Sequence, residues 1–423
     1  MKLTTSFLLL SVWMMYVGAA RKWFLPNFPD QLFVSLIFFA VLLYVSIGFK
    51  IFLKSPCPRW FYFYFLAIFF WGVIGTIYSK VSNPMVLLCG LSNYFSFFPL
   101  CLAAAFVFRD NDQLIEFFKK MAYFTVPVLI LGFLQYSSPA DSLINKYVDS
   151  EKFVATMGGQ YARVTGTFSY IAGYSIFLTF AFTITLGAVV MRANLKEVVL
   201  LGGFLVGVFL NALMTGSRTA VWWCIINLSL FLGVYCFLKL KSLIPTLFKL
   251  SLVFALGFYL LSQNPQVNQI YSAFSSRAHA FSEEITNRLD DNFTPFKFLN
   301  QAGLIGYGMG TTYPPSYRYI KNWHDMTQDF EEEPERVLLE LGLVGYLLVY
   351  SWRFLIFIYC LSICFKLRRF REFGLVLSLT IYQVSFLQMN HLLFNATSSF
   401  LYWFAIGCVV LIRHNRLKAE FNK

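Results

Sequence analysis

The sequence is short of charge. Only 13% of its 423 residues are charged, whereas 58% are hydrophobic and the mean hydropathy is +0.62. A soluble domain carries roughly 25% charged residues, so about half of the usual charge is missing. This shortage argues against a soluble enzyme, and the length is better divided into membrane spans than into soluble domains.

Cysteine and histidine patterns are also lacking. Seven of the eight cysteines lie in apolar runs, the exception being Cys57, and none falls in the one long polar segment. No CxxC or Cys/His spacing is present, so the sequence predicts neither a disulfide framework nor a metal site, and we expect no cofactor.

The net charge of +13 does not indicate a nucleic-acid partner. Lysine and arginine are scattered through short loops and form no basic face that could follow a phosphate backbone. The abundant aromatic residues, 50 Phe and 24 Tyr, fit a lipid-facing surface with interfacial belts.

Apolar runs long enough to cross a bilayer predict an all-α polytopic membrane protein with about twelve spans. The first run ends in Val17-Gly18-Ala19-Ala20, which resembles a signal-peptidase site, but the many runs behind it favour an uncleaved first span. The predicted spans lie near 4–20, 31–49, 61–79, 85–107, 120–138, 168–191, 198–215, 219–238, 246–262, 337–365, 373–390 and 395–412.

Loop charge predicts the orientation of these spans. Most lysines and arginines fall in the loops of one side, for example Lys54, Arg59, Arg368 and Arg369, and that side is expected to be cytoplasmic. Both termini then lie in the cytoplasm of a bacterial cell, in a multi-pass cytoplasmic membrane protein.

Three regions follow from this topology. Residues 1–262 form a transmembrane region of about nine spans, and residues 337–423 form about three spans with a cytoplasmic tail. Between them, residues 263–336 form a large, partly helical loop on the periplasmic or extracellular side. A loop of this length is too long for an inert linker, so we expect it to carry function.

Arginines supply the strongest candidates for chemistry. Arg218, in Met214-Thr215-Gly216-Ser217-Arg218-Thr219-Ala220, is predicted at the outer membrane surface, where it needs an anionic partner or extends to the interface. A lipid-linked phosphate would suit its planar fork of donors. Arg277 and Arg288 lie eleven residues apart and share a face if 273–289 is helical, so they could clamp a diphosphate or pair with loop carboxylates.

The end of the long loop holds candidate bases. An acidic group that includes Glu331 and Glu332 precedes the tenth span, and His324 lies shortly before it. Acidic residues favour a helix N-terminus on electrostatic grounds alone, but either type could act as a general base. His391, in the last outer turn, and Arg353, within the tenth run, are further polar candidates.

Glycines at 303, 306, 308 and 310 suggest a loop whose backbone amides approach a ligand closely. The pattern neither follows a clear strand nor opens a clear helix, so a dinucleotide site is not indicated.

Taken in chain order, the predicted spans, the long outer loop and the motifs quoted below resemble those of the bacterial O-antigen ligase and O-antigen polymerase superfamily. The resemblance covers essentially the whole chain. It is carried by Arg21-Lys22-Trp23-Phe24-Leu25-Pro26, Arg163-Val164-Thr165-Gly166-Thr167-Phe168-Ser169, the TGSRTA at 215–220, the LIGYGMG at 304–310 and the ERVLLELGLVG at 335–345.

The resemblance implies a GT-C-like bundle and a substrate carried on undecaprenyl diphosphate. Arg218 would bind the lipid diphosphate, with Arg163 and either Arg277 or Arg288 beside it, while Arg21 and Lys22 would lie at the lipid phosphates. The expected partners are an undecaprenyl-diphosphate-linked oligosaccharide donor and acceptor, membrane lipid and other polysaccharide-assembly proteins.

One departure bears on the reaction. Ligases of the superfamily carry a His-Asn pair where this chain has Glu331-Glu332. We therefore expect a metal-independent glycosyltransferase that polymerises repeat units of a surface polysaccharide such as O-antigen, capsule or exopolysaccharide. The alternatives are a ligase that transfers glycan to lipid A core or protein, and a flippase or exporter of lipid-linked oligosaccharide.

Overall fold

The computed structural model describes most of the chain. The described residues are 3–25, 55–79, 81–148, 154–157, 161–191, 194–239, 251, 255, 259, 265–279, 295–321, 332–387 and 391–421. The predicted span near 31–49 lies outside them, as does nearly all of the span predicted near 246–262.

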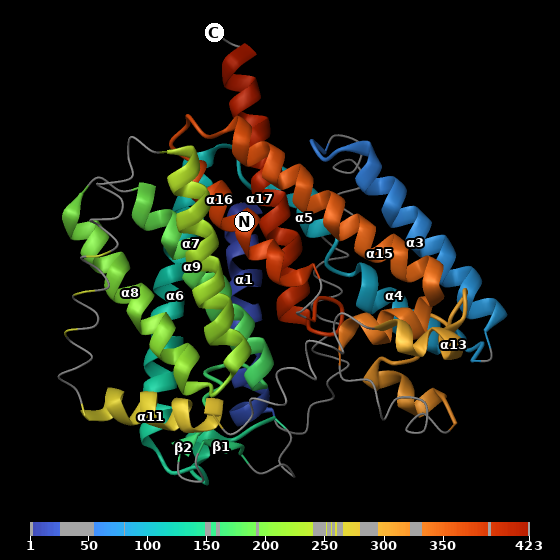
Figure 1. The fold of residues 1–423 in the computed structure, drawn as a ribbon, viewed down its shortest axis with the longest axis horizontal. Coiled ribbons are helices and arrows are strands. Elements are labelled where there is room, and N and C mark those ends of the chain that lie inside the picture. Colours follow the sequence, from blue (N-terminus) through green and yellow to red (C-terminus); the bar gives the residue numbers. More distant parts are fainter. Residues whose placement is uncertain are drawn as a thin grey trace.

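Helices dominate the described residues (Figure 1). The only sheet in this part of the chain pairs β1 (Thr156–Met157) with β2 (Tyr161–Ala162) in antiparallel register. The main helices are α1 (Leu3–Ala19), α3 (Arg59–Tyr78), α4 (Pro84–Phe95), α5 (Pro99–Val107), α6 (Asn111–Ser137), α7 (Ile171–Met191), α8 (Leu195–Met214), α9 (Arg218–Leu238), α11 (Pro265–His279), α15 (Glu333–Lys366), α16 (Phe373–Tyr382) and α17 (Ala396–Phe421). Shorter helical turns are η1 (Ala20–Phe24), η2 (Leu143–Asn145), η4 (Pro295–Phe298), α13 (Leu299–Ala302), η5 (Pro314–Tyr319) and η6 (Gln383–Phe386).

Eight of the described helical segments are long and apolar enough to cross a membrane. The 17-residue α1 and the apolar stretch Phe373–Phe386 are shorter. The predicted all-α, multi-pass membrane protein is therefore confirmed, whereas the count of twelve spans stays a prediction. The run predicted near 85–107 is interrupted between α4 and α5, where Pro99 has no N–H to continue the helix.

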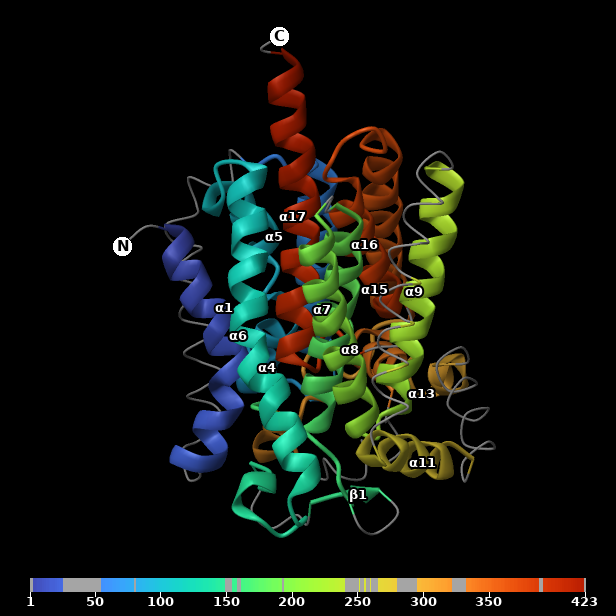
Figure 2. The ribbon, with the colours of Figure 1, turned by 90° about the vertical axis from the view of Figure 1, so that its left-hand side faces the viewer.

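The bundle is centred on α17. Of its apolar window 83% is buried, against 28% for α3 at the periphery. Helix α17 packs against α5, α7 and α16, while α7 also contacts α8 and α9 (Figures 1 and 2). On the other side of the bundle, α15 packs against α3 and α13.

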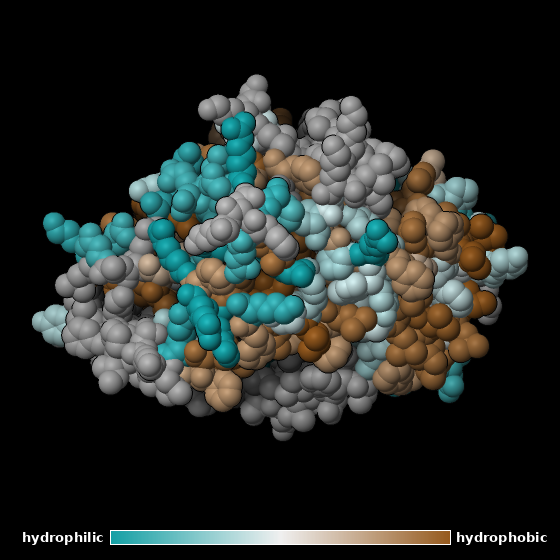
Figure 3. Space-filling model, turned by 90° about the horizontal axis from the view of Figure 1, so that it is seen from above, coloured by the Kyte–Doolittle hydropathy of each residue, from teal (hydrophilic) through white to brown (hydrophobic). Residues whose placement is uncertain are grey.

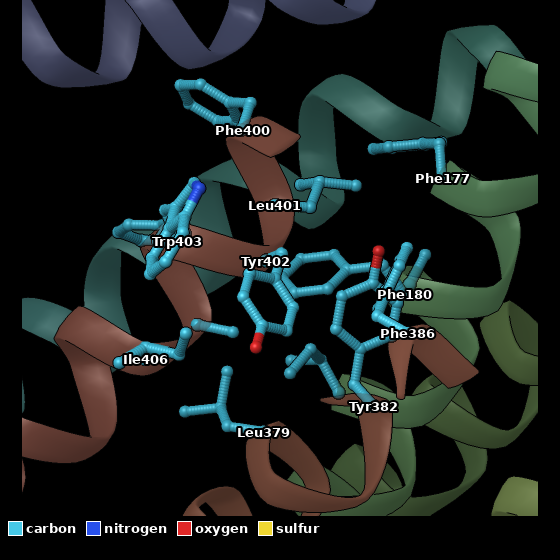
Figure 4. Close-up of a cluster of buried hydrophobic side chains, with 14 of the residues drawn as sticks. Phe177, Phe180, Leu379, Tyr382, Phe386, Phe400, Leu401, Tyr402, Trp403 and Ile406 are labelled. Atoms are coloured by element: carbon cyan, nitrogen blue, oxygen red, sulfur yellow. The ribbon is translucent and has the colours of Figure 1, made fainter. Parts of the chain in front are cut away.

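Aromatic rings fill much of the interior, beyond the lipid-facing role expected from composition. In Figure 4, Tyr382 lies with its ring centroid 5.0 Å from that of Phe180 and 5.1 Å from that of Phe386, and Tyr402 approaches Phe386 at 5.5 Å. These separations suit edge-to-face aromatic packing. Because lipid tails are as apolar as these side chains, such close packing holds membrane helices together better than hydrophobicity does.

The connections between the described helices lie at the two ends of the bundle. The turns after α5, α7 and α15 lie at the end that carries the C-terminus, whereas η1, both strands and α11 lie at the opposite end (Figures 1 and 2). Figure 3 looks onto the C-terminal end, where hydrophilic side chains gather over one half of the surface. Arg109 and Arg371, from turns at this end, and Lys120 of α6 are exposed. The opposite end carries the segments predicted to act.

Candidate functional site

Three segments far apart in the sequence meet at the end opposite the C-terminus. The guanidinium of Arg21, in η1, donates to the hydroxyl of Ser169 at 3.3 Å, and Arg163 Nε donates to the carbonyl of Thr215 at 2.9 Å. The backbone N–H of Val164 also donates to the carbonyl of Met214 at 3.2 Å. The motifs at 21–26, 163–169 and 215–220 therefore form one cluster through their described residues.

The turn between α8 and α9 contacts Arg163 and leads directly into Arg218, two arginines that the sequence predicts for the site. Gly216 adopts a φ of +61°, a conformation that glycine reaches without strain. A Cβ added there would lie 2.7 Å from the Met157 sulfur and 3.2 Å from Arg163 Nε, so this glycine also makes room for its neighbours. Ser217 then caps α9 by accepting a hydrogen bond from the N–H of Ala220 at 3.4 Å.

Arg218 is the first residue of α9 and is half-buried. The N-terminus of a helix carries partial positive charge, so both the backbone and the side chain favour an anion at this point. The sequence correctly predicts the turn and the start of the helix.

Lys22 lies inside the protein. The sequence predicts it at the lipid phosphates, but its exposed fraction is 1%. Its Nζ donates to Thr165 Oγ1 at 2.6 Å and to the carbonyl of Gly166 at 3.1 Å, and no described carboxylate pairs with it. Burial lowers the pKa of the Lys22 ammonium to about 7, because the charged form loses its hydration.

Gln135 holds this part of the site, although the sequence pattern does not single it out. It is fully buried in α6, where its Oε1 accepts from the N–H groups of Thr165 and Gly166 and its Nε2 donates to the carbonyls of Ile144 and Gly166. One side chain thus fixes the turn that carries the Lys22 acceptors. An isolated amide near the outer end of an apolar run is the only signal that could have revealed it.

Acidic residues gather at the start of α15, and their described contacts tie this helix to its neighbours. Glu333 forms an ion pair with Arg353 at 2.6 Å and accepts from the N–H of Leu393 at 2.7 Å. Glu335 lies 3.1 Å from Lys297 of η4. Arg353, noted from sequence as an intramembrane charge, therefore forms a buried ion pair.

Glu332 is the N-terminal cap residue of α15, and its carboxylate lies 3.8 Å from His391 Nε2. Its side chain is 12% exposed and that of His391 is 36% exposed. Both residues are candidates from sequence. Nothing in the sequence pairs them, because the helices α15 and α16 lie between them along the chain.

The glycine-rich loop does not have the ligand-facing geometry expected from its sequence. The N–H groups of Tyr307 and Gly308 donate to the carbonyls of Leu339 and Glu340 at 2.8 and 3.0 Å. A Cβ at Gly306 or Gly310 would collide with backbone of α15 or α4. These glycines allow close packing of protein on protein, so the expected approach of their amides to a ligand is wrong for this loop.

The remaining predicted site residues are only partly visible. His324, Glu331 and Arg288 lie outside the described residues. Arg277 belongs to α11, which contacts β1 and α8, but its side chain also lies outside the described part. The helix considered over 273–289 is described only as far as His279, so the shared face of the two arginines stays a prediction.

An apolar cavity lies elsewhere, between α6, α7, α8 and α16. About 800 Å³ of space, part of it open to the surroundings, lies between these helices, and its lining includes Phe118, Met121, Phe177 and Phe204. Its polar lining is slight, so it suits hydrocarbon better than sugar.

Among the described residues, no group of three or more His, Cys, Asp or Glu side chains is arranged to hold a metal ion. Comparison of the chain with protein-family models and with curated proteins found no match.

Proposed function

We propose that this protein is a membrane glycosyltransferase that joins undecaprenyl-diphosphate-linked oligosaccharide units into a surface polysaccharide. The single observation that supports it most is the meeting of Arg21, Lys22, Arg163 and Arg218 at one end of the bundle. In the proposed orientation this end faces the periplasm or the cell exterior. A lipid diphosphate carries its anionic groups at that depth.

The reaction is a displacement at the anomeric carbon of the donor sugar. An acceptor hydroxyl forms the new glycosidic bond as the bond to the lipid diphosphate breaks, and the hydroxyl proton passes to a base. The diphosphate is already a good leaving group, so the protein chiefly stabilises the negative charge that develops on it. Arg218 and Arg163 suit this role because a guanidinium binds two phosphate oxygens at once.

The backbone that carries these arginines is braced before any substrate binds. Arg163 is tied to the carbonyl of Thr215, and Gly216 makes the turn into α9, so the two side chains come from a braced junction. Such preorganisation favours charge stabilisation, because little rearrangement is needed during the reaction.

The first test follows surface polysaccharide in cells that carry single substitutions. Arg218→Ala and Arg163→Ala are expected to shorten the chain-length distribution, whereas Arg369→Ala, an exposed arginine at the C-terminal end, should leave it unchanged. Membrane insertion is checked by tag accessibility. Wild-type chain lengths in inserted Arg218→Ala protein would contradict the proposal.

Deletion of the gene separates the proposed activity from its two rivals. Single repeat units exported or attached to lipid indicate a polymerase. Full-length polymer that stays on the lipid carrier indicates a ligase, and intermediates retained at the cytoplasmic face indicate a flippase.

A further inference from the structure

A second pair of polar residues lies at the same end of the bundle as the basic cluster. His391 and Glu332 come from the last outer turn and from the cap of α15, and 3.8 Å separates His391 Nε2 from the nearer Glu332 carboxylate oxygen. That distance exceeds a hydrogen bond but is short enough for strong charge interaction. More than a third of the His391 side chain is exposed.

The turn that carries His391 is anchored on both sides. The N–H of Leu393 donates to Glu333 at 2.7 Å, and the Ser399 hydroxyl donates to the carbonyl of Leu392. The side chains of Leu392 and Leu393 are buried, and the guanidinium of Arg336 lies over the ring of Phe394 at 5.1 Å. The backbone is therefore held while the imidazole reaches the surface, which is the arrangement a reactive side chain needs.

This turn adjoins the basic cluster. A Cβ at Gly173 would lie 3.4 Å from the hydroxyl of Thr397, the second residue of α17, which follows the turn. Gly173 follows closely on Ser169, the acceptor of the Arg21 guanidinium. The starts of α7 and α17 are therefore in contact, and we expect a sugar on a diphosphate at the basic cluster to reach the His391 turn.

Resting on the proposed function, we propose that His391 is the general base of the transfer and that Glu332 is its positioning residue. The neutral imidazole accepts the proton of the acceptor hydroxyl as the hydroxyl oxygen bonds to the anomeric carbon and the diphosphate departs. The nearby carboxylate stabilises the imidazolium that results. A histidine suits this task because its ordinary pKa lies close to neutral pH.

Several charged or titratable groups face this pair within the described residues. Glu333 is neutralised by Arg353, whereas Arg336 and Tyr313 pack against Phe394 from α15 and from the turn before η5. Glu332 is therefore the described carboxylate closest to the imidazole. Since a general base must be neutral to accept a proton, transfer should fall as the pH drops and the imidazole becomes protonated.

The test uses purified full-length protein in liposomes with undecaprenyl-diphosphate-linked oligosaccharide. His391→Ala and His391→Gln are expected to lower kcat about 10²–10⁴-fold with little change in KM, and to abolish the acidic limb of the pH profile. Glu332→Gln should keep the limb but move it to lower pH, because the imidazolium loses its nearby negative charge. His414→Ala, near the C-terminal end of α17, the helix that follows the His391 turn, is the matched control.

The outcomes separate the base from the proposed function. An active wild type with an unchanged rate and acidic limb in both His391 variants would overturn the assignment alone, and loss of the limb in His324→Ala instead would transfer the role to that residue. A wild-type protein that forms no polymer would overturn the proposed function and this assignment with it. A shift of the limb in folded Glu332→Gln that matches the expected direction supports the pair independently of any folding defect in the His391 variants.

Discussion

Lys22 and Arg353 are both buried cations, with exposed fractions of 1% and 2%, but they are stabilised in different ways. Arg353 has the carboxylate of Glu333 at 2.6 Å and donates to the carbonyl of Phe386 at 3.3 Å. Among the described residues, Lys22 has a hydroxyl, a carbonyl and the ring of Trp23 as partners, but no carboxylate. A buried charge without a counter-ion is costly, so the Lys22 ammonium tends to lose its proton, whereas the charge of Arg353 is neutralised in place.

This difference separates a structural ion pair from a site that can change its charge. On the α15 side of the bundle, Glu333 already neutralises the charge of Arg353, so an added anion would bind there with little electrostatic gain. Beside Lys22, an anion would supply the missing negative charge and favour the protonated amine. The region around Lys22 is therefore the better place to look for phosphate binding.

The largest expected loss of stability comes from breaking the buried ion pair between Arg353 and Glu333. Arg353→Met should lower the free energy of unfolding by about 3–5 kcal/mol, because Glu333 is left buried and unpaired. Adding Glu333→Gln should restore part of the loss. Denaturant unfolding in detergent micelles measures both variants. Lys120→Met, which breaks the exposed pair with Glu116, should change stability by less than about 1 kcal/mol. Equal losses in the buried and exposed variants would contradict this account.

The anion-binding side is tested through Arg218. Arg218→Ala is expected to weaken binding of undecaprenyl diphosphate in nanodiscs by about 10- to 100-fold, since a charge-assisted hydrogen bond contributes about 1.5–3 kcal/mol. Titration followed by native mass spectrometry measures the affinity, with Arg353→Met representing the α15 side and the exposed Arg369→Ala as the folded control. If Arg353→Met weakens binding as much as Arg218→Ala, the division between the two regions does not hold.

The pH dependence of stability probes Lys22 directly. Its folded pKa, about 7, lies below the ordinary lysine value, so the unfolded chain binds more protons between these two values. Stability should therefore rise with pH, by about 2 kcal/mol between pH 7 and pH 9, and fall as the pH returns to 7. Lys22→Met should flatten this dependence. A wild-type unfolding free energy that falls over the same interval would show that Lys22 is not a buried cation of lowered pKa.

The smallest expected effect is a difference in stability between alanine variants of two glycines, one beside the basic cluster and one in α15. Gly216 and Gly342 have φ values of +61° and +65°. A methyl group at Gly216 meets the flexible Met157 side chain, whereas at Gly342 it meets the backbone of Leu304. Both alanine variants incur about 1–2 kcal/mol of strain from the positive φ, and Gly342, with a ψ of −174°, lies in a region that is essentially restricted to glycine. Gly342→Ala should lose more stability by roughly a further 1–2 kcal/mol, and thermal unfolding of the two variants checks the order.

Local sequence was sufficient to locate most helices. The starts of α9 and α17 fall within a residue of the prediction, because Ser217 and Asn395 punctuate long apolar runs. The start of α6 was predicted nine residues too late, since its first turns are polar and capped by Asp110.

Contacts between distant segments were beyond sequence pattern. Glu333 and Leu393, or Arg21 and Ser169, are joined only by the fold, so the sequence could name candidate residues without pairing them. The glycine-rich loop was misread for the same reason. Its close approach is real, but the partner is the backbone of α15, which a single sequence cannot identify.

The non-helical backbone at Gly342 divides α15 into a short acidic segment and a long membrane-crossing helix. From Leu343 to Lys366 the helix is roughly 36 Å long, enough to cross the hydrocarbon of a bilayer with some tilt. The preceding turns carry Glu332, Glu333 and Glu335 and are fastened by the 303–308 loop, whose amides bond to the last carbonyls before the break. Carbonyls of the same loop also accept from the N–H groups of Leu343 and Val344 just beyond the break, so the loop bridges the two parts and fixes the angle at which the acidic segment meets the membrane-crossing helix.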